Sequence, residues 1–294
     1  MKVKSYALKL NEAGYPDPVT ITTAYTKVEN NIGKLLLPTR FLPIEHHGEH
    51  WESGRAAGDV GCLADGKIIS SHIIKEAQPF LNAGSTVLDI GSHMGTMSMI
   101  LSKCLSLVGG GNIVSIEASP QNFVCAKYNI EKNAAPGVNH TVHNYVCIED
   151  STAQPRVKFP VHEVPEFLSG QYSYISEGEY KSGEMVLHSK RVPIGSYYEV
   201  PTISVDALKL EKLDVIKIDC EGAEVGVVRG AAATIKKYKP AILVEVPDAP
   251  EARLEHLDKI FSIIPPGSRS RRCFGSSQGR TANDWLIWWP EKSV

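Results

Sequence analysis

Val87-Leu-Asp-Ile-Gly-Ser-His-Met-Gly95 is the stretch that decides the fold of this 294-residue chain. Its apolar residues predict a buried strand that breaks into a loop between Gly91 and Gly95, and the run from Thr96 predicts a helix after the loop. A strand that leads through a glycine-bearing turn to a helix N-terminus is typical of a site for a nucleotide-like ligand. Asp89, two residues before the first glycine, disfavours a phosphate there and suits a cationic group.

From residue 67 onward, runs with helical spacing alternate with short apolar runs. The expected strands cover 86–90, 113–116, 138–148, 214–219, 241–246 and 285–289, and the expected helices cover 68–80, 96–107, 120–130, 222–237 and 249–262. This alternation predicts an α/β fold with a mostly parallel central sheet. The basic residues Arg269, Arg271 and Arg272 are expected in a surface loop.

Two regions depart from the alternating pattern. Residues 1–66 form an expected N-terminal extension that contains one predicted strand over 19–28, and residues 67–294 form the main domain. Within the main domain, the region 150–200 is rich in glycine and proline, which predicts a β-rich insertion of hairpins and loops.

Composition excludes several classes of protein. The formal net charge of −2 gives no electrostatic footprint for nucleic acid, and the apolar runs are too short for a membrane span. The N-terminus has no apolar segment of the kind found in signal peptides. The six cysteines form no CxxC pair, which favours free thiols in a reducing compartment and hence the cytoplasm.

Two ligands compete for the first glycine loop. A dinucleotide site needs GxGxxG, whereas here the spacing is Gly91-x-x-x-Gly95, without the middle glycine that lets a pyrophosphate approach. Glu117, at the end of the second strand, suits the ribose hydroxyls of either ligand. Asp89 favours S-adenosylmethionine, whose methionine part carries an ammonium group. The alternative is an ordinary α/β crossover with incidental acids.

A second cluster of acids follows the fourth predicted strand. Leu213-Asp-Val-Ile-Lys-Ile-Asp-Cys-Glu-Gly-Ala-Glu224 places Asp219 and Glu221 just past that strand. Glu224 is interpreted as an acid in the first turn of a helix, where the helix dipole favours it.

The carboxyl ends of parallel strands meet at one edge of a sheet, where ligands bind in open α/β folds. Asp89, Glu117, Asp219 and Glu245 are all expected at that edge. Like charges oppose one another's ionisation, so four acids there favour cation binding, proton abstraction or metal coordination.

With these motifs in place, the chain resembles the FkbM-type family of S-adenosylmethionine-dependent methyltransferases over roughly 67–290. The matching segments are Val87 to Gly95, Ile116-Glu-Ala-Ser-Pro-Gln-Asn-Phe123 with Asn129 and Asn133, Thr202-Ile-Ser-Val-Asp-Ala-Leu208, Asp214 to Glu224 with Arg229-Gly-Ala231, Pro240-Ala-Ile-Leu-Val-Glu245 and Asn283-Asp-Trp-Leu286. The chain departs from the family pattern at Ser92-His93, where Ala-Asn is usual, and at Ala118, where proline is usual.

The resemblance implies a Rossmann-like methyltransferase fold and a set of donor contacts. Asp89, Gly91 and Gly95, with Ser92 and His93 in the same loop, would hold the methionine part of S-adenosylmethionine. Glu117 and the adjacent Ala118 would lie at the ribose, and Asn144 and Tyr145 on the adenine side.

Methyl transfer to a hydroxyl needs alignment and a group that takes the proton. Asp219 and Glu221 are the candidate bases, and His46, from the His46-His-Gly-Glu-His50 segment, is a third. Asp219 and Glu245 also resemble in position the Mg²⁺ site of catechol O-methyltransferase, so oxygen ligation of Mg²⁺ is a further hypothesis.

The sequence therefore predicts an S-adenosylmethionine-dependent O-methyltransferase acting on a hydroxyl of a sugar, glycan or glycosylated metabolite. Alternatives are an O-methyltransferase of a polyketide or small phenol, an N-methyltransferase, and a methyltransferase-like binding protein without catalysis. The expected partner is a small-molecule or glycan acceptor, with the N-terminal extension serving acceptor binding or assembly of a homo-oligomer.

Overall fold

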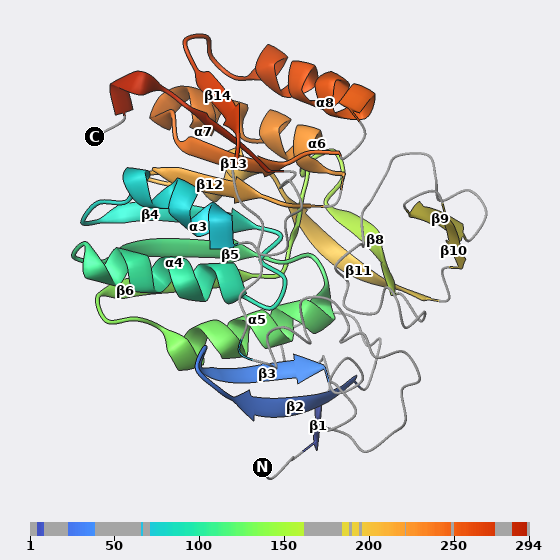
Figure 1. Ribbon diagram of the computed structural model, residues 1–294. Coiled ribbons are helices and arrows are strands. Elements are labelled where there is room, and N and C mark those ends of the chain that lie inside the picture. The colour runs from blue at the N-terminus through green and yellow to red at the C-terminus, as the bar shows by residue number, and fades with distance from the viewer. Residues whose placement is uncertain are drawn as a thin grey trace.

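A seven-stranded sheet forms the centre of the molecule (Figure 1). The computed structural model describes residues 5–8, 23–38, 66, 71–161, 184–187, 190–193, 196–220, 222–247, 250–273 and 284–292. The strand order is β14-β15-β13-β12-β4-β5-β6. These strands are β4 (Ser85–Ile90), β5 (Gly111–Ile116), β6 (Val138–His143), β12 (Val215–Ile218), β13 (Ala241–Glu245), β14 (Arg269–Arg272) and β15 (Asp284–Trp288).

The sheet is parallel apart from β15, which pairs antiparallel with both β13 and β14. The chain fills the sheet outward from β4, first through β5 and β6 and later through β12 and β13 on the other side. The direction in which successive strands are added therefore reverses between β4 and β12. In open α/β sheets, ligands bind at such a switch point.

Helices cover both faces of this sheet, because each strand presents alternate side chains to opposite sides. On one face, Leu88 and Ile216 share a core with the helices α6 (Glu224–Arg229), α7 (Ala232–Tyr238) and α8 (Pro250–Ile263). On the other face, Val87 and Val215 share a core with α3 (Ser71–Ala77) and α4 (Thr96–Leu107). The prediction of a Rossmann-like α/β fold is thus confirmed.

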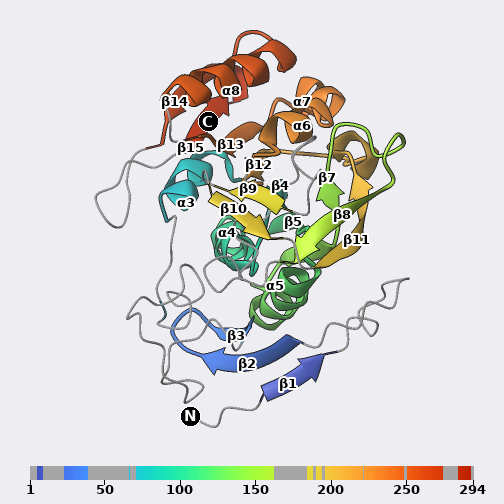
Figure 2. The ribbon, with the colours of Figure 1, turned by 90° about the vertical axis from the view of Figure 1, so that its right-hand side faces the viewer.

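The N-terminal strands form a small antiparallel sheet that packs on the helix α5 (Pro120–Asn133), as Figures 1 and 2 show. Its strands are β1 (Ser5–Leu8), β2 (Thr23–Glu29) and β3 (Lys34–Pro38). Residues of β2 and β3 share a core with α5 and with Met94 of the glycine loop. The extension is therefore attached to the part of the main domain that borders the loop.

Two asparagines of α5 bind the backbone of β3. Asn129 accepts the Leu36 N–H at 2.5 Å and donates to the carbonyls of Leu36 and Met94 at 3.3 and 2.9 Å. One turn later, Asn133 accepts the Lys34 N–H and donates to the Lys34 carbonyl, both at 2.9 Å. These two side chains, spaced i, i+4, bind the edge of β3 that pairs with no strand in the described residues.

The expected β-rich insertion contains a second small sheet and a hairpin. The sheet has the order β7-β11-β8, and β9 pairs antiparallel with β10. The strands are β7 (Val146–Cys147), β8 (Arg156–Val161), β9 (Glu184–Leu187), β10 (Lys190–Pro193) and β11 (Ser196–Ile203).

Two predicted elements are split. The strand expected over 138–148 is divided at Asn144 and Tyr145 into β6, in the main sheet, and β7, which pairs with β11. The helix expected over 222–237 is divided into α6 and α7, because the Asp206 carboxylate accepts the N–H groups of Ala233 and Thr234 and so begins a new helix.

The prediction of a surface loop at Arg269, Arg271 and Arg272 is wrong, because these residues form the edge strand β14. Arg271 makes a two-pronged ion pair with Glu76 of α3, with its Nη1 2.8 Å from Oε1. At the outer edge of a sheet, polar side chains are compatible with strand structure, so the basic composition did not reveal it. No helix in the described part of the chain is long and apolar enough to cross a membrane.

Candidate functional site

The glycine loop follows β4 at the carboxyl edge of the sheet and begins α4. Gly91 and Gly95 have φ values of 75° and 79°, a conformation that glycine adopts without strain. A β-carbon at Gly91 would lie 1.8 Å from the backbone oxygen of Asp219. The loop therefore touches the end of β12 so closely that only glycine fits.

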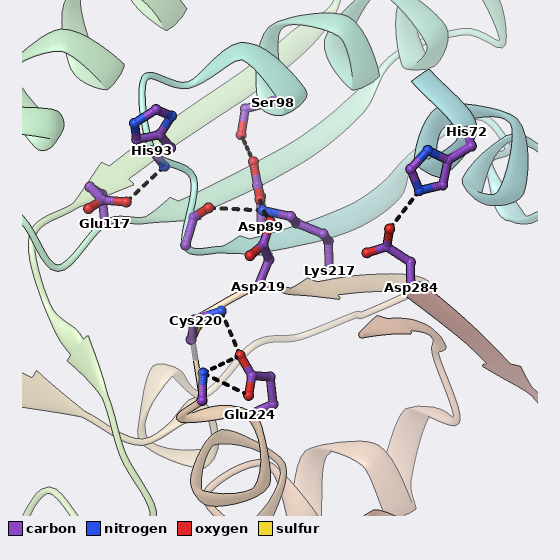
Figure 3. Close-up of polar contacts among 12 residues, drawn as sticks. His72, Asp89, His93, Ser98, Glu117, Lys217, Asp219, Cys220, Glu224 and Asp284 are labelled. Carbon is purple, nitrogen blue, oxygen red and sulfur yellow. Dashed lines mark hydrogen bonds and ion pairs between the residues drawn. The ribbon is translucent and has the colours of Figure 1, made fainter. Parts of the chain in front are cut away.

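The loop is fixed to the end of β5 by backbone and side-chain contacts. The N–H groups of Gly91 and Ser92 donate to the Ile116 carbonyl at 2.9 and 3.1 Å. His93 has φ 51°, and its N–H donates to Glu117 Oε2 at 2.8 Å (Figure 3). Asparagine and histidine are both enriched in this left-handed conformation, so His93 meets the same backbone requirement as the asparagine usual in the resembling family.

Glu117 is a buried acid that accepts two backbone N–H groups. Its side chain is nearly buried, and its second oxygen accepts the Ser119 N–H at 2.9 Å. Burial raises the pKa of Glu117 from 4.5 to about 7, although the hydrogen bonds from Ser119 and His93 oppose the rise. The Asn122 side chain also interacts with this carboxyl group and opposes the rise. Because each carboxylate oxygen accepts two hydrogen bonds, the group keeps capacity for a ligand hydroxyl.

The other residues predicted near the adenosine lie beside Glu117. Asn144 donates to the carbonyls of Glu117 and Ala118 at 2.7 and 3.0 Å. Tyr145 is half-buried, with its ring 5.7 Å from that of His143. Among the described residues, Asn144 Oδ1 and the buried Ser92 Oγ find no hydrogen-bond partner. Buried polar atoms normally have one, so the region offers unused polar groups to a ligand.

Asp89 lies deeper than expected for a direct ligand contact. It is 0% exposed, and its Oδ2 accepts the Ser98 hydroxyl at 2.6 Å. Its Oδ1 forms an ion pair with Lys217 Nζ at 3.5 Å (Figure 3). Any direct role for Asp89 in holding a cationic ligand stays a prediction, since the carboxylate in this structure faces other side chains.

Lys217, in β12, is the residue that sequence reasoning missed. It lies in register with Asp89 on the adjacent strand. Its Nζ donates to the Gly91 carbonyl at 2.9 Å and lies 3.2 Å from Asp219 Oδ2. The signal was present in the sequence, because a lysine inside the apolar run Val-Ile-Lys-Ile is expensive to bury without partners.

Asp219 is more exposed than Asp89, Glu117 or Glu224, with 35% of its side chain accessible. Burial opposes its ionisation, but the Lys217 ammonium and a hydrogen bond with Glu245 together lower the pKa of Asp219 below its usual value. His93 also contributes to the lowered pKa through its charge. The structure thus brings the loop, Lys217, Asp219 and Glu245 together at one edge.

Glu224 is buried and holds the segment after Asp219. Its carboxylate accepts the N–H groups of Cys220 and Gly222 at 3.0 Å (Figure 3). Burial raises the pKa of Glu224 to about 7. The sequence interpretation as a helix-start acid fits these backbone contacts, and the structure adds that the carboxylate positions the loop.

The described residues give no support for three of the site predictions. Glu221 and His46 lie outside the residues that the structure describes. The Mg²⁺ hypothesis finds no support, because no three metal-ligating side chains gather in the described part of the chain. An ammonium group from Lys217 already lies beside Asp219.

Comparison with known proteins identifies the family. A model of the methyltransferase FkbM domain matches residues 89–273, well over half of the chain. The chain therefore belongs to the family of methyltransferases with an FkbM domain. A search of curated proteins gave no match.

Solved structures similar to this chain are distant. Methyltransferase FkbM from Methylobacillus flagellatus KT is 17% identical with a TM-score of 0.44, and the match covers 70% of this chain and 44% of that chain. This chain thus spans less than half of that protein. The O-methyltransferase TomG from Streptomyces achromogenes, in complex with SAM, is 13% identical with a TM-score of 0.37, covering 74% and 75% of the two chains. Precorrin-6y C5,15-methyltransferase from Geobacter metallireducens GS-15 is 11% identical with a TM-score of 0.39, covering 74% and 87%.

Proposed function

We propose that this protein is an S-adenosylmethionine-dependent O-methyltransferase whose acceptor is a hydroxyl of a sugar, a glycan or a glycosylated metabolite. The observation that carries the proposal is the junction of the glycine loop with the end of β12, where Gly91 abuts the backbone of the ionised Asp219. Membership of the FkbM methyltransferase family supports methyl transfer. The sugar hydroxyl rests on the family resemblance alone.

The donor would be held by the loop and by the residues around Glu117. The backbone of the loop from Gly91 to Gly95 suits the methionine part, and the Glu117 carboxylate suits the two ribose hydroxyls. Ser92 Oγ and Asn144 Oδ1 would gain the partners that they lack among the described residues. When bound, the donor supplies a methyl group attached to a positively charged sulfur.

Asp219 would act on the acceptor as a charged hydrogen-bond acceptor. Its lowered pKa makes it a weak base at neutral pH, whereas an efficient general base has a pKa near the working pH. We therefore assign to Asp219 the orientation of the acceptor hydroxyl, whose proton becomes acidic only as the new carbon–oxygen bond forms. His46 and Glu221 remain proposed as the final proton acceptors.

The remaining assignments are proposals with narrower support. The extension over 1–66 is proposed to form one side of the acceptor site, because β2 and β3 share a core with Met94 of the loop. A cytoplasmic location is proposed because the five described cysteines, Cys104, Cys125, Cys147, Cys220 and Cys273, are all free thiols.

The test begins with donor binding and then follows the methyl group. Calorimetry should show binding of S-adenosylhomocysteine to the wild type, weaker binding to Glu117→Ala and Asp89→Ala, and unchanged binding to the exposed control Glu255→Ala. Labelled S-adenosylmethionine should then transfer its methyl group to a glycan hydroxyl, and Asp219→Ala should abolish this transfer.

Three results would contradict the proposal in different ways. Absence of binding would reject the donor site, and binding without transfer to any acceptor would point to a binding protein. Label recovered on nitrogen, or only on a small phenol, would reject the proposed acceptor class.

A further inference from the structure

Lys217 is a buried cation with three oxygen partners from three different parts of the site. Only 6% of its side chain is exposed. Its Nζ lies 2.9 Å from the Gly91 carbonyl oxygen, 3.2 Å from Asp219 Oδ2 and 3.5 Å from Asp89 Oδ1 (Figure 3). The contacts with Gly91 and Asp219 are hydrogen bonds, whereas the contact with Asp89 is an ion pair without one.

The charge of Lys217 is shared between two carboxylates. Burial alone would lower the pKa of Lys217, but the carboxylates of Asp219 and Asp89 raise it above its usual value, so the amine stays charged. The Lys217 ammonium then faces the two carboxylates of Asp89 and Asp219 and cannot neutralise both. Asp219 is also hydrogen-bonded to Glu245 and is influenced by the charge of His93. Because Asp89 is fully buried and Asp219 is one-third exposed, Asp219 is the accessible one of the two carboxylates.

The hydrogen bond from Lys217 to the Gly91 carbonyl links the Lys217 ammonium directly to the glycine loop. The carbonyl of Gly91 lies in the turn that no other residue type fits, because a side chain there would meet the backbone of Asp219. On its other side, the turn is held by the N–H groups of Gly91 and Ser92 on the Ile116 carbonyl. Lys217 therefore supplies the side-chain hydrogen bond that fixes the turn from the β12 side.

We propose that Lys217 is a positioning residue that locks the glycine loop against β12 and leaves Asp219 as the charged, accessible acid of the site. This inference rests on the proposed function for the identity of the ligand, but its structural part does not. If Lys217 only neutralised Asp89, removing both charges together would leave the loop unchanged. If Lys217 also holds the loop, the same double replacement should loosen it.

The decisive variant removes the buried pair together. Lys217→Met alone leaves Asp89 uncompensated in the interior and is expected to lower the unfolding midpoint strongly. Asp89→Asn/Lys217→Met replaces both charges by neutral groups of similar size and should recover most of that loss. The matched control is Lys212→Met, at the opposite end of the same strands, where Nζ lies 3.1 Å from the Gly84 carbonyl and 3.4 Å from Asp214.

The first measurement needs no ligand. Hydrogen–deuterium exchange of the amides in 91–95 should accelerate at least tenfold in Asp89→Asn/Lys217→Met, with no change in Lys212→Met. If the double variant exchanges like the wild type, Lys217 only balances Asp89 and the proposal is overturned. This result would stand whether or not the protein binds a methyl donor.

The second measurement uses S-adenosylmethionine and S-adenosylhomocysteine in calorimetry. At least tenfold weaker binding of both by the double variant, with unchanged binding by Lys212→Met, is the expected result. If the loop of the double variant exchanges faster but its affinity is unchanged, Lys217 has no role in donor binding. If the wild type binds neither compound while the loop of the double variant exchanges faster, the proposed function is rejected, but the role of Lys217 in holding the loop stands.

Discussion

Replacement of Glu117 by glutamine should change the way in which stability depends on pH. Burial raises the pKa of Glu117 from 4.5 to about 7 in the folded protein. A group with a raised folded-state pKa stabilises the fold fully below its unfolded-state pKa, and this contribution is lost as pH rises through the folded-state pKa. For Glu117, the window of loss runs from about pH 4.5 to about pH 7.

The magnitude follows from the two pKa values. The difference between about 7 and 4.5 is about 2.5 pH units, which at about 1.4 kcal/mol per unit amounts to about 3.5 kcal/mol over the full range. Between pH 5 and pH 8.5 the wild type should lose about 2.5 kcal/mol of this contribution, because part of the range lies below pH 5. Glu117→Gln has no such titration.

The glutamine variant also carries a cost that does not depend on pH. His93 and Ser119 donate to different oxygens of Glu117, and the variant replaces one of these oxygens by an NH2 group. One of the two contacts is therefore lost, at a cost of about 1–3 kcal/mol at every pH. The useful quantity is therefore the free energy of unfolding of the variant minus that of the wild type, followed across pH.

Urea unfolding at pH 5, 6, 7 and 8.5 measures this difference, which should rise in favour of the variant by about 2.5 kcal/mol across the series. Glu255→Gln is the control, because this exposed carboxylate has a pKa lowered by Lys259 and should give a flat difference over the same range. A flat difference for Glu117→Gln as well would refute the argument that burial dominates at this carboxyl group.

Three further predictions concern the loop, the extension and metal dependence. Gly91→Ala should abolish donor binding in calorimetry and lower the unfolding midpoint, because its β-carbon would lie 1.8 Å from the Asp219 backbone oxygen; wild-type binding would contradict the described turn. Asn129→Ala should cost about 2–4 kcal/mol in urea unfolding, since it leaves buried backbone groups of Leu36 and Met94 unpaired, and a loss below about 1 kcal/mol would show that the Asn129 hydrogen bonds do not hold β3 on α5. Saturating EDTA should leave turnover unchanged, because the Lys217 ammonium already supplies the cation beside Asp219, and a loss that Mg²⁺ restores would revive the metal hypothesis.

The parts of the fold that the sequence predicted correctly depend on local patterns. The helix expected over 96–107 coincides with α4, because the glycine loop fixes its start and a glycine run follows its end. The parallel sheet followed from buried strands alternating with helices. These features are determined by residues close together in the chain.

The parts that were missed depend on distant residues. The break between α6 and α7 needs Asp206, which lies in another segment and caps the second helix. The edge strand β14 needs β15 and the ion pair between Arg271 and Glu76. Lys217 was missed for the same reason, since its meaning depends on its register with Asp89 in the neighbouring strand.

The acidic segments that contain Asp89 and Asp219 are joined electrostatically through Lys217. This arrangement should affect the relative affinities for S-adenosylmethionine and S-adenosylhomocysteine. Asp89 and Asp219 share the Lys217 ammonium, which cannot neutralise both, and Asp219 is the more accessible of the two carboxylates. On the proposed function, the charge of Asp219 favours a positively charged sulfonium over the neutral thioether that remains after methyl transfer, because opposite charges attract. Asp219→Asn should therefore weaken the binding of S-adenosylmethionine more than that of S-adenosylhomocysteine, so that the dissociation constant of the first divided by that of the second should rise. Calorimetry of both compounds on the wild type and on Asp219→Asn measures this ratio. Equal weakening of both would mean that Asp219 acts through the shape of the loop, since only a charge effect distinguishes the two compounds.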